Sequence, residues 1–191
     1  MSTVLFVNAC VRENSRTLAL ARTVLAKLEG EIEEVSLYDV NLASLDAKGM
    51  AARDRAFSTK DFSDRTFDLA RQFAGTDTIV IAAPYWDLMF PAVLKTYFEA
   101  ITVNGLTFTY SERGIPTGLC RADRMIYVTT SGGPIVKNFG FEYACALAKT
   151  FYGIEDVVCI CAEGLDIHGA DPEAILRAAQ KSVDSILANG Q

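Results

Sequence analysis

Apolar residues along the chain fall into short runs that predict five strands. Val4 to Asn8 is an almost continuous apolar run, as expected of a strand that is covered on both faces. Similar runs extend from Thr78 to Ala83 and from Arg124 to Thr130. Two more strands are predicted at Ile32 to Leu37, where weak alternation indicates a sheet edge, and at Val157 to Cys161.

Between these runs the apolar residues recur at helical spacing. Thr17 to Glu29 is the clearest predicted helix, with apolar residues along one side. Further helices are predicted at Phe62 to Ala74, from Pro91 onward, at Phe141 to Tyr152 and at Pro172 to Ala188. Tyr38 to Lys60 is polar and shows no clear period, and the glycine-containing segment Val103 to Leu119 predicts a hairpin-like excursion.

Strands that alternate with helices imply a parallel sheet with right-handed crossovers. The sequence therefore predicts an α/β fold in which helices cover both faces of a doubly wound sheet with the strand order 2-1-3-4-5. The sequence contains no internal repeats, low-complexity tracts or linkers. Residues 1–191 are accordingly expected to form one domain.

Charge and cysteine content narrow the classes of partner. The 191 residues carry 18 Lys and Arg against 24 Asp and Glu, a net charge of -6, which disfavours nucleic acid and anionic membranes because both need a basic face. The N-terminus lacks a basic segment before its short apolar run, and no apolar stretch approaches the ~20 residues of a membrane helix. The five cysteines show no C-x-x-C spacing and are spaced irregularly. These features predict a reduced, cytoplasmic protein without a metal site.

Open parallel sheets bind ligands beyond the carboxyl ends of their strands, where the strand order reverses. Here this edge carries the loops after the first, third and fourth strands. The first loop contains no glycine, which disfavours a dinucleotide turn or a Walker loop. It offers hydroxyl groups at Ser15 and Thr17, cations at Arg12 and Arg16, and the free N–H groups of a helix start, which together suit a phosphate monoester. The alternative is that Ser15 only caps the helix.

The other two loops suit a flat ring. The segment Pro84-Tyr85-Trp86-Asp87-Leu88 gathers aromatic side chains, the only tryptophan among them, at a strand end, although core packing or a subunit contact would also explain it. The segment Thr130-Ser131-Gly132-Gly133 ends in glycines that let backbone amides approach a ligand, as a plain turn would too. The first loop thus suits a phosphate, the second an aromatic ring, and the third the polar edge of that ring. Together the three loops predict FMN as the cofactor.

Further segments between Pro84 and Gly133 carry a family signature. They are Leu94-Lys95, Tyr97-Phe98-Glu99, Gly105-Leu106-Thr107-Phe108, Tyr110 and Gly118-Leu119. With these segments the chain resembles, over most of its length, the flavodoxin-like NAD(P)H:quinone oxidoreductase family and especially its FMN-dependent azoreductase branch. The family's phosphate loop corresponds to Cys10 and Ser15-Arg16-Thr17. Its Met-Tyr-Asn-Phe segment corresponds to Tyr85-Trp86-Asp87-Leu88, and its Ser-Arg-Gly-Gly segment to Thr130-Ser131-Gly132-Gly133.

Three positions depart from the family pattern. Asp87 stands where the family has an amide, Leu88 where it has an aromatic residue, and Ser131 where it has an arginine. A carboxylate close to the ring would disfavour the anionic reduced flavin. The expected effect of these departures is on the substrate and the redox tuning of the flavin rather than on FMN itself.

The resemblance implies a two-electron, ping-pong oxidoreductase. NADH or NADPH would deliver hydride to flavin N5 and then give way to a quinone, azo or nitroaromatic acceptor. Because the cofactor carries the chemistry, no catalytic side chain is expected, and the only histidine, His168, is interpreted as a solvated loop residue or part of the pocket rim. The family also implies a homodimer with the pocket at the subunit interface, to which exposed aromatic residues of the Pro91 helix and the hairpin would contribute.

Two other functions are compatible with the sequence. Cys10, Arg16 and Thr17 match the C-x5-R-[S/T] loop of low-molecular-weight tyrosine phosphatases. Asp171 would then resemble their general acid, but Glu13 inside the loop would repel a phosphate dianion. The second alternative is a non-enzymatic FMN-binding protein, because the reaction requires no catalytic side chain that the sequence could reveal.

Overall fold

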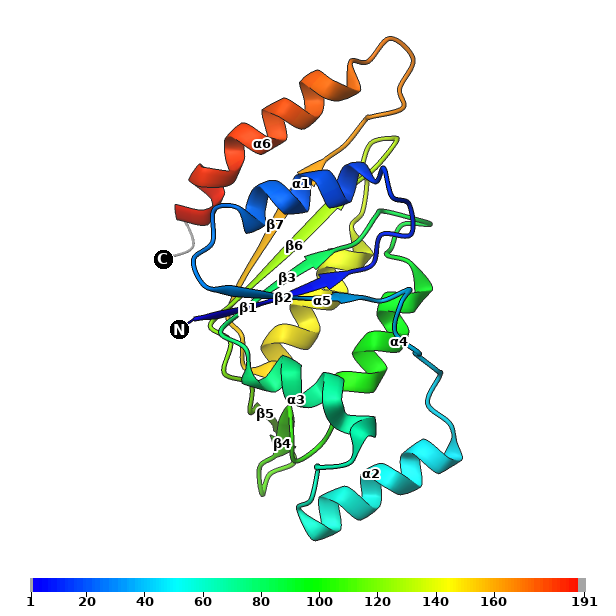
Figure 1. Ribbon diagram of the computed structural model, residues 1–191, viewed down its shortest axis with the longest axis vertical. Coiled ribbons are helices and arrows are strands. Elements are labelled where there is room, and N and C mark those ends of the chain that lie inside the picture. The colour runs from blue at the N-terminus through cyan, green and yellow to red at the C-terminus, as the bar shows by residue number, and fades with distance from the viewer. Residues whose placement is uncertain (1, 189–191) are drawn as a thin grey trace.

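The computed structural model describes residues 2–188, and a five-stranded parallel sheet forms their centre. The strands are β1 (Thr3–Asn8), β2 (Glu31–Ser36), β3 (Thr78–Ala82), β6 (Arg124–Thr130) and β7 (Asp156–Ala162). Their order is β2-β1-β3-β6-β7, and all neighbouring pairs run parallel (Figure 1). The predicted α/β class and the order 2-1-3-4-5 of the parallel strands are therefore confirmed.

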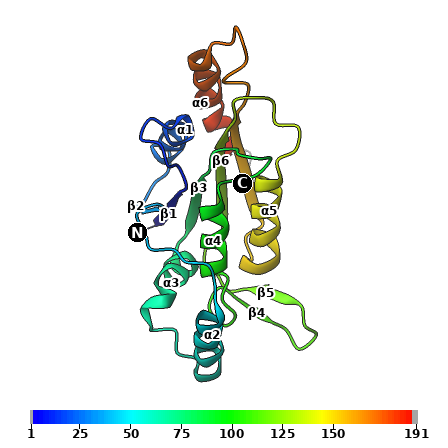
Figure 2. The same ribbon diagram turned by 90° about the vertical axis from the view of Figure 1, so that its right-hand side faces the viewer.

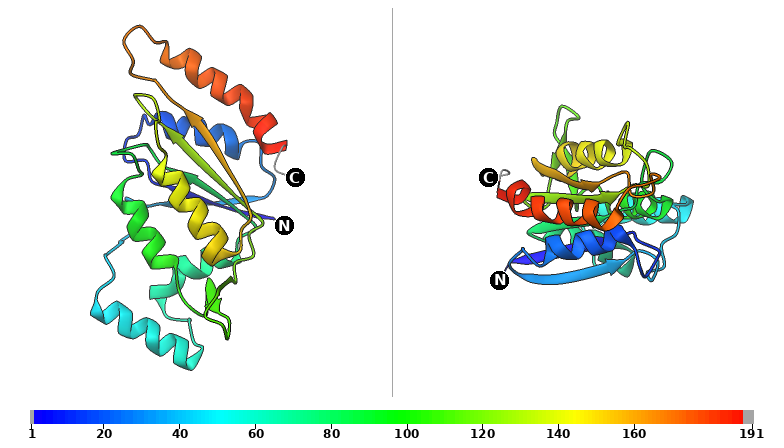
Figure 3. Two further views of the ribbon diagram at one scale, coloured as in Figure 1. Left: turned by 180° about the vertical axis from the view of Figure 1, so that it is seen from behind. Right: turned by 90° about the horizontal axis from the view of Figure 1, so that it is seen from above.

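Helices cover both faces of this sheet (Figures 2 and 3). One layer holds α1 (Arg16–Leu25) and α6 (Pro172–Ala188), and the other holds α3 (Asp68–Gly75), α4 (Ala92–Ile101) and α5 (Phe139–Leu147). Alternate residues of each central strand enter opposite cores, so that Phe6 packs with α1 while Leu5 and Val7 face the other layer. Burial on both faces explains why these strands read as continuous apolar runs.

The predicted hairpin is present. β4 (Phe108–Tyr110) and β5 (Pro116–Gly118) pair in antiparallel fashion. The expectation that the Pro91 helix exposes its aromatic residues is wrong, because Tyr97 and Phe98 are 0% and 1% exposed. Tyr97 packs against Phe73 of α3, so these rings complete the core of their own chain.

A helix that the sequence did not predict, α2 (Ala47–Thr59), forms inside the polar segment Tyr38 to Lys60. Only Ala56 of this helix is buried, so α2 has no apolar stripe that a period could reveal. Arg53 ties α2 to the last turn of α4 by donating to the Ala100 and Thr102 carbonyls at 3.3 and 3.4 Å. Such carbonyls have no partner inside their own helix, and α2 lies beyond α4 at one end of the molecule (Figure 1).

Three predicted helices have different bounds in the structure. α1 ends at Leu25 instead of Glu29, and a 3-10 turn η1 (Arg65–Phe67) precedes α3. The segment predicted as one helix to Tyr152 divides into α5 and a π-helical turn, η2 (Ala148–Tyr152). Among the described residues, no helix combines the length and the apolar character needed to cross a bilayer.

Candidate functional site

A pocket of about 230 Å³ opens at the carboxyl ends of the strands, beside the reversal of strand order between β1 and β3. It is lined by Val11, Arg12, Asn14, Ser15, Arg16, Pro84, Trp86 and Asp166. The first and second predicted loops thus share one pocket. Asp166 joins them from the loop between β7 and α6.

The start of α1 forms one end of the pocket. Ser15 is the N-cap, and its Oγ accepts a hydrogen bond from the Leu18 amide at 3.2 Å. Within residues 2–188, the amides of Arg16 and Thr17 donate to no acceptor, as the first turn of a helix leaves them. Ser15 therefore caps the helix and lines the pocket as well. With the guanidinium groups of Arg12 and Arg16, this helix start suits a phosphate dianion.

Cys10 lies beneath the same loop and does not line the pocket. The residue is 8% exposed, and its Sγ lies 3.8 Å from the Ala82 carbonyl oxygen. Burial raises the pKa of the Cys10 thiol; a hydrogen bond with Ser15 lowers that pKa, and the charge of Glu34 raises it further. The net rise keeps the thiol protonated at neutral pH, which makes it a poor nucleophile.

Asp171 has a structural use. Its Oδ1 accepts a hydrogen bond from the Ala174 amide at 3.0 Å in the first turn of α6, and Arg177 lies 3.8 Å from its other oxygen. A buried thiol and a carboxylate engaged at a helix start are poor substitutes for a nucleophile and a general acid. Both observations disfavour the phosphatase alternative.

The loop after β3 makes a tight turn. The backbones of Trp86 and Met89 exchange hydrogen bonds of 2.9 and 2.8 Å, and Asp87 and Leu88 between them adopt φ angles of +51° and +67°. Trp86 lines both the pocket beside the start of α1 (the phosphate-side pocket) and an adjoining groove of about 610 Å³. Asp87 and Lys95 line this groove only. Asp87, whose carboxylate is predicted to lie beside the flavin ring, thus lines this groove, and Leu88 is half exposed.

The third loop is close by, and its first two residues are covered. Thr130 and Ser131 are buried, and a hydrogen bond of 2.6 Å between the hydroxyls of Thr17 and Thr130 ties the start of α1 to the end of β6. In the described chain, the amides of Gly132 and Gly133 donate no hydrogen bond, so that a ligand could engage them. None of the four residues from Thr130 to Gly133 lines the pocket.

Tyr85 holds the second loop against the third. Its amide donates to the Thr130 carbonyl at 3.0 Å, and its hydroxyl donates to the Lys137 carbonyl at 2.8 Å. The three predicted loops are therefore neighbours, although only the first two open onto the same pocket. The assignment of their residues to a cofactor stays a prediction.

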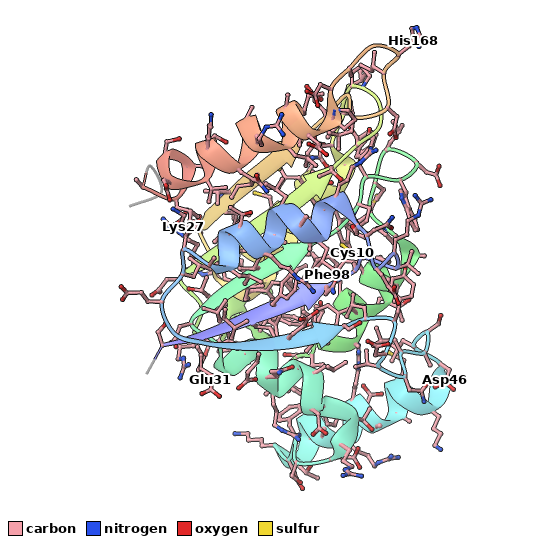
Figure 4. All side chains as sticks on the ribbon, turned by 45° about the horizontal axis from the view of Figure 1, so that its top comes forward. Cys10, Lys27, Glu31, Asp46, Phe98 and His168 are labelled. Atoms are coloured by element: carbon pink, nitrogen blue, oxygen red, sulfur yellow. The ribbon has the colours of Figure 1, made fainter. Side chains whose placement is uncertain are left out.

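Asp166 is the residue that sequence reasoning missed. Its Oδ1 pairs with Arg16 Nη1 at 2.7 Å, across 150 positions of the chain. No local motif marks it, because the contact depends on the path of the loop after β7. His168, from the same loop, lies exposed at its outer tip (Figure 4) and does not line the pocket.

Residues 2–187 match a family model described as the flavodoxin-like fold. Among its relatives, an FMN-dependent NADH:quinone oxidoreductase from Coprothermobacter proteolyticus is 34% identical over 202 residues, which cover 97% of this chain and 98% of the relative. An FMN-dependent NADH:quinone oxidoreductase 2 from Clostridium acetobutylicum is 34% identical over 191 residues, which cover 93% and 94% of the two chains.

Solved structures resemble the fold over its full length. An azoreductase from Bacillus anthracis superposes with a TM-score of 0.83 at 23% identity, covering 99% of this chain and 100% of its own. An FMN-dependent NADH-azoreductase from the same species, in complex with FMN, superposes with a TM-score of 0.80 at 24% identity, covering 100% of both chains. At these identities the likeness establishes the fold.

Proposed function

The chain belongs to the flavodoxin-like family of FMN-dependent NADH:quinone oxidoreductases, and from that premise we propose that it is an FMN-dependent enzyme itself. It takes two electrons from NADH or NADPH and passes them, in a ping-pong cycle, to quinones, azo compounds or nitroaromatics.

The start of α1 carries this proposal. Two amides without partners among the described residues, at Arg16 and Thr17, lie next to the guanidinium groups of Arg12 and Arg16. This donor set fits one terminal phosphate, because it combines N–H groups, the helix dipole and fixed positive charge. Trp86, which lines the same pocket, offers an aromatic surface to the rest of the cofactor.

When bound, FMN supplies the chemistry by accepting a hydride and returning it to the acceptor. The chain holds and orients the cofactor. The amides of Gly132 and Gly133 can stabilise negative charge on the edge of the ring, in the way that oriented dipoles stabilise oxyanions. His168 lies away from the pocket, and we assign it no catalytic role.

A homodimer in the cytoplasm is part of the proposal. Trp86, Leu88 and Tyr38 are 41%, 51% and 43% exposed, and two of them line the groove that adjoins the phosphate-side pocket. Exposed apolar side chains gathered around one groove are typical of a surface that another molecule covers. A second copy that covers this groove would add a wall to the site.

The absorption spectrum of the purified protein tests this function. We expect the bands of bound oxidised flavin, which NADH or NADPH bleaches under anaerobic conditions and a quinone such as menadione restores. A colourless protein that takes up no added FMN would overturn the proposal. A yellow protein that neither donor bleaches would instead favour the non-enzymatic FMN-binding protein.

A further inference from the structure

The ion pair between Arg16 and Asp166 lies at the phosphate-side pocket. Arg16 Nη1 and Asp166 Oδ1 are 2.7 Å apart, and the side chains are 42% and 68% exposed. Both residues line the pocket itself. A carboxylate therefore already occupies one face of the arginine that the proposed function assigns to a phosphate.

Asp166 also lies against Gly132 of the third loop. A Cβ placed on Gly132 would lie 2.4 Å from Asp166 Oδ2, so that this carboxylate oxygen sits directly over the Gly132 backbone. The segment from Thr130 to Gly133 does not line the pocket, whereas Asp166, which lies against Gly132, does. One oxygen of the Asp166 carboxylate thus pairs with Arg16, and the other lies close to the Gly132 backbone.

The backbone beneath this side chain is fixed. The Asp166 amide donates to the Gly132 carbonyl at 2.9 Å, and the Leu165 amide donates to the Ser131 carbonyl at 3.2 Å. These bonds extend the pairing of β6 with β7 beyond the strand ends. A ligand that needs both Arg16 and the Gly132 edge can therefore gain them by a rotation of the Asp166 side chain, without moving the loop.

We propose that Asp166 is an internal competitor for the cofactor phosphate. It neutralises Arg16 in the ligand-free protein, and FMN binds by displacing the carboxylate from Arg16 and from above Gly132. Because an exposed ion pair is weak, a phosphate dianion with additional amide donors displaces the carboxylate. The affinity for FMN is nevertheless lower than it would be if Arg16 had no carboxylate partner. Asp166 thereby lowers the affinity for FMN and makes the cofactor exchangeable. This inference rests on the proposed function.

The test compares FMN with riboflavin, which shares the ring but lacks the phosphate, on cofactor-stripped wild-type protein and Asp166→Asn. Asparagine keeps the shape of the side chain and removes its charge. We expect the Kd for FMN to fall roughly two- to fivefold, the size of the effect of an exposed ion pair, while the Kd for riboflavin stays unchanged. In an Arg16→Gln background the same substitution should have little effect on FMN.

The pair between Lys27 and Asp184 provides a matched control. It joins Lys27, just after the end of α1, to Asp184 of α6 at the surface, with an N–O distance of 3.0 Å and exposures of 46% and 68%. Lys27 lies at the far end of α1 from Cys10 (Figure 4). Asp184→Asn should leave the Kd for FMN unchanged.

Each other result overturns the inference in a recognisable way. A higher Kd for FMN in Asp166→Asn would mean that Asp166 positions Arg16 for the phosphate. An unchanged Kd would mean that the carboxylate and the phosphate do not compete. Failure of the wild-type protein to bind either flavin would remove the proposed function, and the inference with it.

Discussion

The hydroxyl oxygens of Thr17 and Thr130 lie 2.6 Å apart in a buried position, where the first turn of α1 meets the end of β6. This hydrogen bond joins two segments that are 113 residues apart in the chain. Because Thr17 lies beside the proposed phosphate grip and Thr130 leads into the glycine-rich loop, the bond fixes the distance between the two ends of the candidate site.

Thr17→Val should therefore destabilise the protein and weaken FMN binding. Valine leaves the Thr130 hydroxyl buried without a partner, which costs about 1–3 kcal/mol. Thr17→Val combined with Thr130→Val should cost less than the sum of the two single changes, because the orphaned group is gone. Chemical denaturation of all four proteins measures this coupling, and strict additivity would show that the bond contributes nothing.

Ser15→Ala should combine a loss of stability with a loss of cofactor affinity. The lost N-cap lowers the free energy of unfolding by about 1 kcal/mol, and the disturbed helix start raises the Kd for FMN. Asp46→Ala is the matched control, since Asp46 caps α2 by accepting from the Gly49 amide at 2.8 Å and does not line the pocket. It should lower stability to a similar degree and leave FMN binding intact. Equal effects on FMN would contradict the assigned site.

Stability should decline at alkaline pH. Burial raises the pKa of Cys120 and of Cys159 to about 12, from an ordinary 9.0. The unfolded thiols ionise first, so the stabilisation is complete below pH 9 and is lost as the pH rises towards 12. The free energy of unfolding, measured between pH 8 and about 11 by denaturant titration, should fall less steeply in a Cys120→Ala, Cys159→Ala double variant. Parallel curves for the two proteins would refute this origin.

Leu88→Gly should raise the stability of the isolated chain. Leu88 has a φ of +67° and is 51% exposed, so its side chain strains the backbone while it buries little surface. Glycine removes that strain and creates Asp-Gly, a preferred pair for a turn with two positive φ angles. We expect a gain of about 0.5–1 kcal/mol. Leu119→Gly, at an exposed leucine without a positive φ, should lower stability instead.

The fold follows from the sequence wherever burial leaves a pattern. The central strands β1, β3 and β6 are buried, and their apolar runs, such as Val4 to Asn8, place them correctly within a few residues. The weaker patterns of the edge strands β2 and β7 place these two within a few residues as well. The sequence did not predict α2, because Ala56 is the single buried residue of this helix. The helix is attached to α4 by the polar contact of Arg53. Local sequence contains no trace of that distant contact.

The candidate site was predictable as far as its loops, but not in its detail. Ser15 and Arg16 could be found because a helix start after the first strand is a known anion site. The direction of the Asp87 side chain depends on the positive φ angles of Asp87 and Leu88. An Asp-Leu pair is not a sequence signal for such a turn. The place of Asp166 depends on its contact with Arg16, 150 positions away in the chain. Rules of residue spacing apply within one helix or strand and do not predict such a contact.

The affinities of the cofactor-stripped wild-type protein for FMN and for riboflavin test most directly whether the start of α1 holds a phosphate. Two amides and two guanidinium groups form charge-assisted bonds with FMN alone, so FMN should bind at least about tenfold more tightly. Arg12→Gln combined with Arg16→Gln should abolish most of that difference. Equal affinities for the two flavins in the wild-type protein would contradict the assignment.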